Sequence, residues 1–141
     1  MSFELENNKD LCCKPTLLNI KKATLCNSTF RTEVWTGKHL QITVMSIPVG
    51  GEIGLERHDD LDQVIKLESG CAKVYMGDSK KCVKLMGTVN TNYAIVIPAG
   101  TWHNAINAGN IPLKVYSIYA PPQHPIGTIH KTKLDSDLSE E

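Results

Sequence analysis

The sequence predicts an all-β domain in which antiparallel strands form a sandwich or a barrel. Short segments alternate between apolar and polar residues, and turns rich in Gly and Pro separate them at close intervals. This combination is typical of antiparallel sandwiches and barrels. The length of 141 residues fits one domain that is large enough to bury its own core.

The expected strands follow one another through residues 30–120. An early strand is indicated where Arg31, Glu33 and Trp35 alternate with their neighbours. The segment 40–44 then places its three aliphatic residues on one face. Further strands are expected at 64–67, 72–76, 83–85, 93–97 and 113–119.

The chain divides into three parts. Residues 1–29 form a leader with a weak helical signal at 17–23, and residues 30–120 form the domain. Residues 121–141 start with a segment that contains Pro and His and end in an acidic tail, which we expect to be frayed. The leader can pack on the domain or on a partner subunit.

The composition argues against several classes of protein. Fifteen Lys and Arg balance fifteen Asp and Glu, so the basic excess of a nucleic-acid or membrane-surface protein is missing. No segment approaches the roughly 18 apolar residues of a membrane span, and the first residues do not resemble a secretory signal. The five cysteines are odd in number and include no CxxC, which indicates free thiols in a reducing cytoplasm.

Two distant segments carry residues suited to chemistry. Glu56 and His58 are two residues apart and project from one face if they lie on a strand, and Gln63 can return beside them. Downstream, Pro98 and Gly100 predict a turn that is followed at once by His103.

Together these segments resemble the two motifs of the cupin family. The first motif, G-x5-H-x-H-x4-E-x6-G, is matched in spacing by Gly50, Glu56, His58, Gln63 and Gly70. The second motif, G-x5-P-x-G-x2-H-x3-N, is matched in spacing by Asn92, Pro98, Gly100, His103 and Asn107. Three positions depart from the motifs, because Glu56 replaces a His, Gln63 replaces the Glu and Asn92 replaces a Gly.

The resemblance implies a jelly-roll barrel, or double-stranded β-helix, that holds a divalent metal. The candidate ligands carried over by position are Glu56, His58, Gln63 and His103. Two imidazoles and one carboxylate are the set of non-haem Fe(II) sites, and Mn, Ni and Zn also suit mixed nitrogen and oxygen ligands. Alternatively, the same side chains form a hydrogen-bonded cluster that lines a barrel without metal.

Other residues are candidates for contact with a substrate. Arg31 can bind an anionic group or form a surface salt bridge. Tyr93, Tyr116 and Tyr119 can form the wall of a substrate pocket or be core or rim residues whose hydroxyls have hydrogen-bond partners. His124 lies in a Pro-rich segment with His130, which can fold over the barrel mouth or cover a sheet edge.

The resemblance leads to three hypotheses about function. The first is a metal-dependent enzyme that acts on a small soluble metabolite and resembles mannose-6-phosphate isomerase, with Glu56 as the catalytic base if it is not a ligand. The second is a metal-dependent dioxygenase, and the third is a sugar- or metabolite-binding protein without turnover. The resemblance also implies a homodimer.

Overall fold

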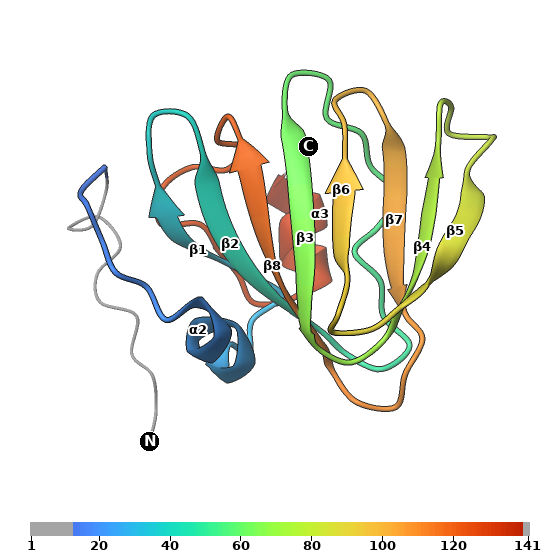
Figure 1. Cartoon of the computed structure of the whole chain (residues 1–141), viewed down its shortest axis with the longest axis horizontal. Helices are drawn as coiled ribbons and strands as arrows, with labels where there is room; N and C mark the ends of the chain where they lie inside the picture. The colour runs from blue at the N-terminus through green and yellow to red at the C-terminus, as the bar shows by residue number, and fades with distance from the viewer. Residues whose placement is uncertain (1–12, 140–141) are drawn as a thin grey trace.

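The computed structural model describes residues 13–139 and confirms the all-β fold. The chain forms two antiparallel sheets that curl into one barrel (Figure 1). In chain order the strands are β1 (Arg31–Thr36), β2 (Gln41–Ile47), β3 (Asp62–Ser69), β4 (Ala72–Gly77), β5 (Lys84–Val89), β6 (Ala94–Ile97), β7 (Trp102–Asn107), β8 (Leu113–Ala120) and β9 (Ile129–His130).

The strand order is that of a jelly roll with short extensions. The larger sheet has the order β6-β3-β8-β2-β1-β9, and the smaller sheet has the order β5-β4-β7. The chain therefore leaves the larger sheet after β3, returns for β6, crosses again to β7 and ends the barrel in β8. Non-local pairings such as β3 with β8 bring residues far apart in the sequence onto one inner surface.

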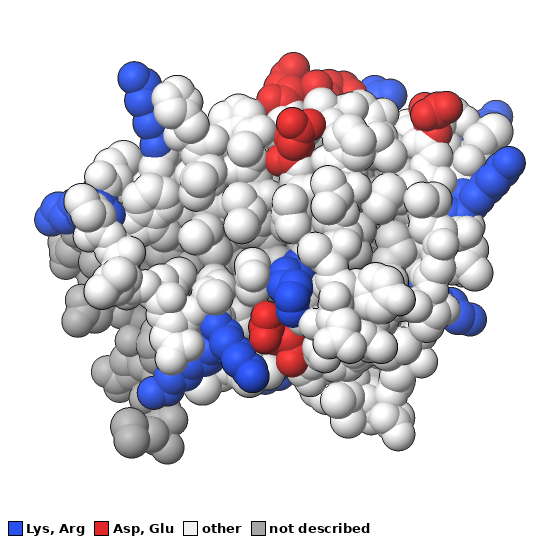
Figure 2. Space-filling view, in the orientation of Figure 1, with Lys and Arg blue, Asp and Glu red and all other residues white. Residues whose placement is uncertain are grey.

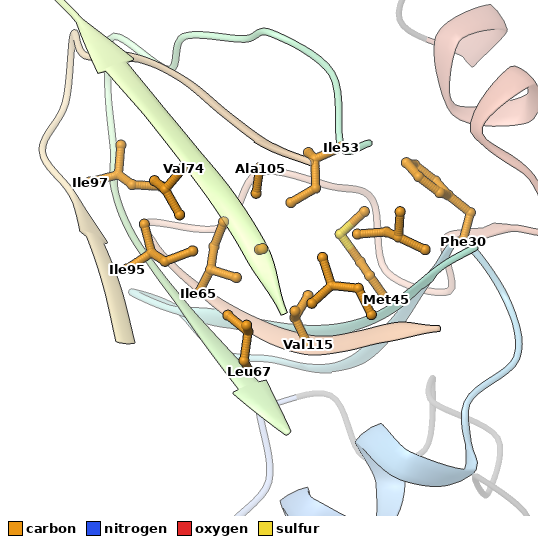
Figure 3. Close-up of a cluster of buried hydrophobic side chains, with 13 residues drawn as sticks. Phe30, Met45, Ile53, Ile65, Leu67, Val74, Ile95, Ile97, Ala105 and Val115 are labelled. Carbon is orange, nitrogen blue, oxygen red and sulfur yellow. The ribbon is translucent and has the colours of Figure 1, made fainter. Parts of the chain in front are cut away.

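The inner surface of the barrel is polar at one end and apolar at the other. Cross-strand partners join Gln41, Tyr119 and Gln63 in one row, and all three side chains are buried. Two inward-facing rows further along the sheet, Met45 of β2 pairs with Val115 of β8, and the apolar core begins there. Figure 3 shows the side chains of this core clustered between the strands. The core consists of Phe30, Met45, Ile47, Ile53, Ile65, Leu67, Ala72, Val74, Ile95, Ile97, Ala105, Leu113 and Val115.

Several elements differ from the sequence-based expectation, among them β9, which lies in the segment after the expected barrel. The helical signal at 17–23 corresponds to α2 (Ile20–Cys26), which starts later because the Asn19 side chain accepts a hydrogen bond from the backbone of Lys22. Strand β7 was not expected separately from the turn before His103. The described part of the acidic tail forms α3 (Lys133–Ser139), so fraying was the wrong expectation for these residues.

Local capping and one buried contact explain α3. The side chains of Thr132 and Asp135 each accept a hydrogen bond from the other residue's backbone N–H, as in a capping box. Ser136 is buried and accepts a hydrogen bond from Arg31. In Figure 1, α3 lies behind β3 and β8.

The outer face of the larger sheet carries few charged side chains, which gather mostly toward the edges of the view (Figure 2). Within residues 13–139 no helix is long and apolar enough to cross a membrane. The expected homodimer and cytoplasmic location stay predictions.

The segment after β8 is held over the barrel mouth by two buried polar side chains. Gln41 accepts hydrogen bonds from the backbone N–H groups of Gln123 and His124 and donates one to the carbonyl oxygen of His124. The Glu33 carboxylate accepts a hydrogen bond from the backbone N–H of Gly127 at 3.0 Å. Residues 121–128 are therefore an ordered part of the domain.

We expect the substitution Gln41→Leu to lower the free energy of unfolding by about 2–4 kcal/mol, because it leaves buried backbone groups of the segment without partners. Urea denaturation followed by circular dichroism measures this change. The matched control is Gln123→Leu, since Gln123 is exposed. An equal loss in both variants would contradict the bracing role of Gln41.

Candidate metal centre

Backbone pairing brings Glu56 next to His103. The N–H of Glu56 donates to the carbonyl oxygen of His103 at 3.0 Å, and the N–H of His103 donates to the carbonyl oxygen of Glu56 at 2.9 Å. This isolated antiparallel bridge joins the segment before β3 to β7. It fixes the side chains of two distant segments on one side of the barrel.

The turn before β7 is fixed from both sides. Gly100 has a φ of 82°, a left-handed conformation that favours glycine. Its N–H donates to the carbonyl oxygen of His58 at 2.8 Å, and the neighbouring N–H of Ala99 donates to the Asp62 carboxylate. The Pro98–Gly100 turn thus holds His58 and His103 in register.

The side chains of Glu56, His58 and His103 converge on a small volume. Their ligand atoms all lie within 4.8 Å of one another. Oε1 of Glu56 is 3.2 Å from Nε2 of His103 and 3.4 Å from Nε2 of His58. Two ligand atoms about 2.1 Å from one ion are about 3.0–3.4 Å apart at octahedral to tetrahedral angles, so these spacings suit a divalent metal.

The hydrogen bonds around the triad also suit a metal. Nδ1 of His103 lies 3.0 Å from the carbonyl oxygen of Thr101, an obligate acceptor. The N–H of a neutral His103 ring is therefore on Nδ1, which directs the lone pair of Nε2 at the carboxylate oxygen of Glu56. Two facing acceptors need a cation or a proton between them. Nε2 of His58 is buried and has no hydrogen-bond partner.

The histidines also stabilise the charge on Glu56. Burial alone would raise the pKa of this carboxyl, but the contacts with His103 and His58 outweigh burial and hold the pKa well below its usual range. Glu56 is thus ionised at neutral pH and available as an anionic ligand.

Gln63 lies on β3 with a buried side chain. Its Nε2 donates a long hydrogen bond of 3.4 Å to Oγ of Ser117, and its Oε1 has no hydrogen-bond partner. The unpartnered oxygen is the atom with which an amide can bind a metal or accept a hydrogen bond from a metal-bound water.

A cavity of about 670 Å³ opens beside the triad. Glu56, Arg57 and His58 line one end of it, and the segment after the barrel supplies the rest. The lining residues from that segment are Gln123, His124, Pro125, Thr128, Ile129, His130 and Ser139. The site therefore combines side chains from the barrel with a wall that is built by the C-terminal extension.

The candidate substrate residues are distributed unevenly around this cavity. His124 lines it, and Arg31 lies directly behind its wall, where NH1 donates to Nδ1 of His130 at 3.1 Å. Tyr93 is half exposed before β6, and Tyr116 lies on the outer face of β8. The structure does not bring these two tyrosines to the cavity.

Tyr119, which the sequence analysis grouped with Tyr93 and Tyr116, links the two ends of the site. Its ring centroid lies 6.1 Å from that of His58 and 5.3 Å from that of His124. Tyr119 is fully buried, and burial raises the pKa of its hydroxyl. The two-residue alternation of β8 could have shown that Tyr119, unlike Tyr116, shares the inner face with Ser117.

The chain belongs to the cupin family, since residues 43–119 match the family described as Cupin domain. A curated relative, the uncharacterized protein YrkC of Bacillus subtilis, is 53% identical over 133 residues, which cover 94% of this chain and 72% of YrkC. The uncharacterized protein L612 of Acanthamoeba polyphaga mimivirus is 39% identical over 114 residues, which cover 80% of this chain and 69% of L612.

Solved structures show the same fold. The crystal structure of BH2720 from Bacillus halodurans has a TM-score of 0.87 and 52% identity, covering 89% of this chain and 95% of that chain. KdgF from Halomonas sp. has a TM-score of 0.56 and 18% identity, covering 66% of this chain and 80% of that chain. The cupin prediction from the two motifs is therefore confirmed.

The environment of His124 makes stability depend on pH. Burial, together with the charge of Arg31, lowers the pKa of His124 from 6.5 to about 3. The unfolded chain therefore takes up this proton at a higher pH than the folded protein does, and the contribution to stability decreases as the pH falls from about 6.5 toward 3. We expect His124→Gln to reduce the loss of stability between pH 7 and pH 5.

Urea denaturation at both pH values measures this effect. The matched control is His39→Gln, because His39 is exposed. The assignment to His124 fails if both variants keep the pH dependence of the wild-type protein.

Proposed function

We propose that this protein is a metal-dependent cupin enzyme that acts on a small metabolite in the cavity beside the triad. The proposed ligands are Glu56, His58 and His103, with Gln63 as a fourth ligand or a partner of metal-bound water. The observation that carries the proposal is the convergence of three ligand atoms within 4.8 Å at the end of the cavity. The native metal is proposed to be Fe, Mn, Ni or Zn, since all four accept nitrogen and oxygen ligands.

A metal at this site would act as a Lewis acid that polarises an oxygen of the substrate. The chain supplies the surroundings. Glu56 provides the negative charge, Thr101 fixes the orientation of His103, and the C-terminal extension forms the cavity wall on the side of His124. Burial keeps the hydroxyl of Tyr119 protonated between the triad and His124.

The cavity lining bears on the type of reaction. An aldose–ketose isomerase needs a base for a C–H proton. Among the described residues that line the cavity, Glu56 is the sole carboxylate, and two histidines engage it. His124 has a pKa of about 3 and is a poor match for a base at neutral pH. These features favour metal chemistry without a protein base, such as that of a dioxygenase, over isomerisation.

The same feature supports a second candidate, which is a cupin that binds a metabolite without turnover. A cavity with hydrogen-bonding groups and no free base is sufficient for binding. This candidate shares the pocket with the enzyme and differs in the fate of the bound molecule.

The first test is the metal content of untagged protein. We expect close to one divalent ion per chain in the wild type, and a loss of at least tenfold in occupancy in Glu56→Ala, His58→Ala and His103→Ala, because each variant removes one of the proposed ligands. Elemental analysis after dialysis against trace-metal buffer measures this.

Two further variants act as controls for the metal test. His124→Ala removes an imidazole from the same cavity but outside the triad, and it should keep its metal. Gln63→Glu should bind the metal more tightly than the wild type, since a carboxylate is a stronger donor than an amide. Unchanged occupancy in the three triad variants contradicts the site.

The second test separates the reaction types. Protein loaded anaerobically with Fe(II) is mixed with small organic acids in the presence of oxygen, and protein loaded with Mn(II) or Zn(II) is mixed with aldose phosphates. We expect oxygen uptake in the first assay and no ketose in the second, because no carboxylate base faces the cavity outside the triad. Ketose formation would restore the isomerase hypothesis, and binding of a ligand recovered unchanged would support the second candidate.

A further inference from the structure

A buried cation lies at the end of the cavity opposite the triad. Arg31 is 2% exposed, and no carboxylate within the described part of the chain forms an ion pair with it. Its NH1 donates to two neutral groups, Nδ1 of His130 at 3.1 Å and Oγ of Ser136 at 2.6 Å. Its Nε is buried without a hydrogen-bond partner. A buried charge of this kind is costly unless an opposite charge compensates it.

No acidic side chain in the described part of the chain lies within ion-pair distance of Arg31. Burial and the charge of Arg31 lower the pKa of the neighbouring His130, although the charge of Asp135 acts in the opposite direction and raises it. The Glu33 carboxylate accepts hydrogen bonds from the backbone of Gly127 and from the hydroxyl of Thr36. The Glu56 carboxylate is engaged by the triad histidines, and Arg57 is paired with Asp59 at 2.8 Å. Arg31 is therefore a buried cation without an ion-pair partner behind the cavity wall, and a divalent metal at the triad would add positive charge at the other end of the cavity.

The hydrogen bond from Arg31 fixes which ring nitrogen of His130 carries the hydrogen. A guanidinium can only donate, so Nδ1 of His130 carries the lone pair and Nε2 carries the hydrogen. Nε2 of His130 then donates to Oγ of Ser139 at 3.1 Å, and both residues line the cavity. The ring of His124 lies next to that of His130, with 6.1 Å between the centroids. Oγ of Ser139 donates to the carbonyl oxygen of Ser136 at 2.8 Å, so His130 and Ser139 are both engaged within the wall. Within residues 13–139 the ring nitrogens of His124 make no hydrogen bond, so its ring is the polar group available to a ligand in front of the fixed positive charge.

We propose that this end of the cavity is an anion subsite, in which the ring of His124 contacts a carboxylate or phosphate group of the ligand, His130 and Ser139 form the wall beside it, and Arg31 supplies the compensating charge. The inference rests on the proposed function, in which the other end of the same ligand lies at the triad. It identifies the substrate class as a small organic anion that carries a further oxygen group for the metal. Since the family match ends at residue 119, the extension after the barrel provides the contacts that select this class.

The test uses metal-free full-length protein with inorganic phosphate and acetate in separate titrations. In the wild type, we expect the imidazole nitrogen signals of His124 and His130 in nuclear magnetic resonance spectra to shift with saturation, while those of the exposed His39 stay unchanged. If only phosphate gives a saturable shift, the anionic group of the ligand is a phosphate ester. If acetate gives a saturable shift, the anionic group is a carboxylate. No saturable shift with either anion overturns the proposal.

A matched pair of variants tests whether Arg31 supplies the positive charge of the subsite. Calorimetry should show that Arg31→Gln binds the anion at least about tenfold more weakly, because the subsite loses its fixed positive charge. Arg57→Gln removes an arginine that lines the same cavity but is paired with Asp59, and its affinity should stay within about twofold of the wild type. Equal affinity in Arg31→Gln and the wild type overturns the proposal. If Arg31→Gln does not fold, the wild-type titration decides.

The outcome is independent of the metal test. Anion binding in metal-free protein, combined with a lack of metal in the wild type, would retain this subsite and remove the metal-dependent function. Full metal occupancy without anion binding would support the metal-dependent function and overturn the anion subsite.

Discussion

The backbone bridge between Glu56 and His103 is the constraint on which the site depends. Its two hydrogen bonds, of 2.9 and 3.0 Å, tie the segment before β3 to the first residues of β7. Because of this bridge, a carboxylate and an imidazole separated by 47 residues face each other at 3.2 Å. The adjacent bond from Gly100 to the carbonyl of His58 then adds the third group. The fold thus converts two sequence motifs into one cluster with little freedom in its backbone.

The sequence was sufficient to predict the barrel, its family and the grouping of Glu56, His58 and His103. There is a physical reason for this. Strand alternation and motif spacing are local properties, so the shared face of Glu56 and His58 follows from two residues of extended chain. The turn at Gly100 is likewise encoded where it occurs. Strand β7 was missed because its apolar positions are few and its polar residues, such as Asn104, serve the site and the turns.

The C-terminal extension was harder to predict because its docking on the barrel depends on distant residues. Gln41 and Glu33 hold its backbone from β2 and β1, and Arg31 holds Ser136 of α3. None of these contacts leaves a pattern within residues 121–139 themselves. An acidic segment that looks frayed in sequence therefore forms a helix through its local cap at Thr132 and Asp135, and buried Arg31 holds this helix on the barrel.

These buried polar groups also explain why the barrel is divided into two halves. The apolar half supplies the driving force for folding, whereas the polar half keeps four side-chain atoms buried without partners, on Arg31, Thr43, His58 and Gln63, among the residues from 13 to 139. Such atoms are destabilising in a protein that has no use for them. His58 and Gln63 lie with the triad, and Arg31 lies behind the opposite end of the cavity. A ligand that bridges a metal and a fixed cation would offset the cost at both ends, which is why the stability of this domain and its binding specificity are expected to depend on the same residues.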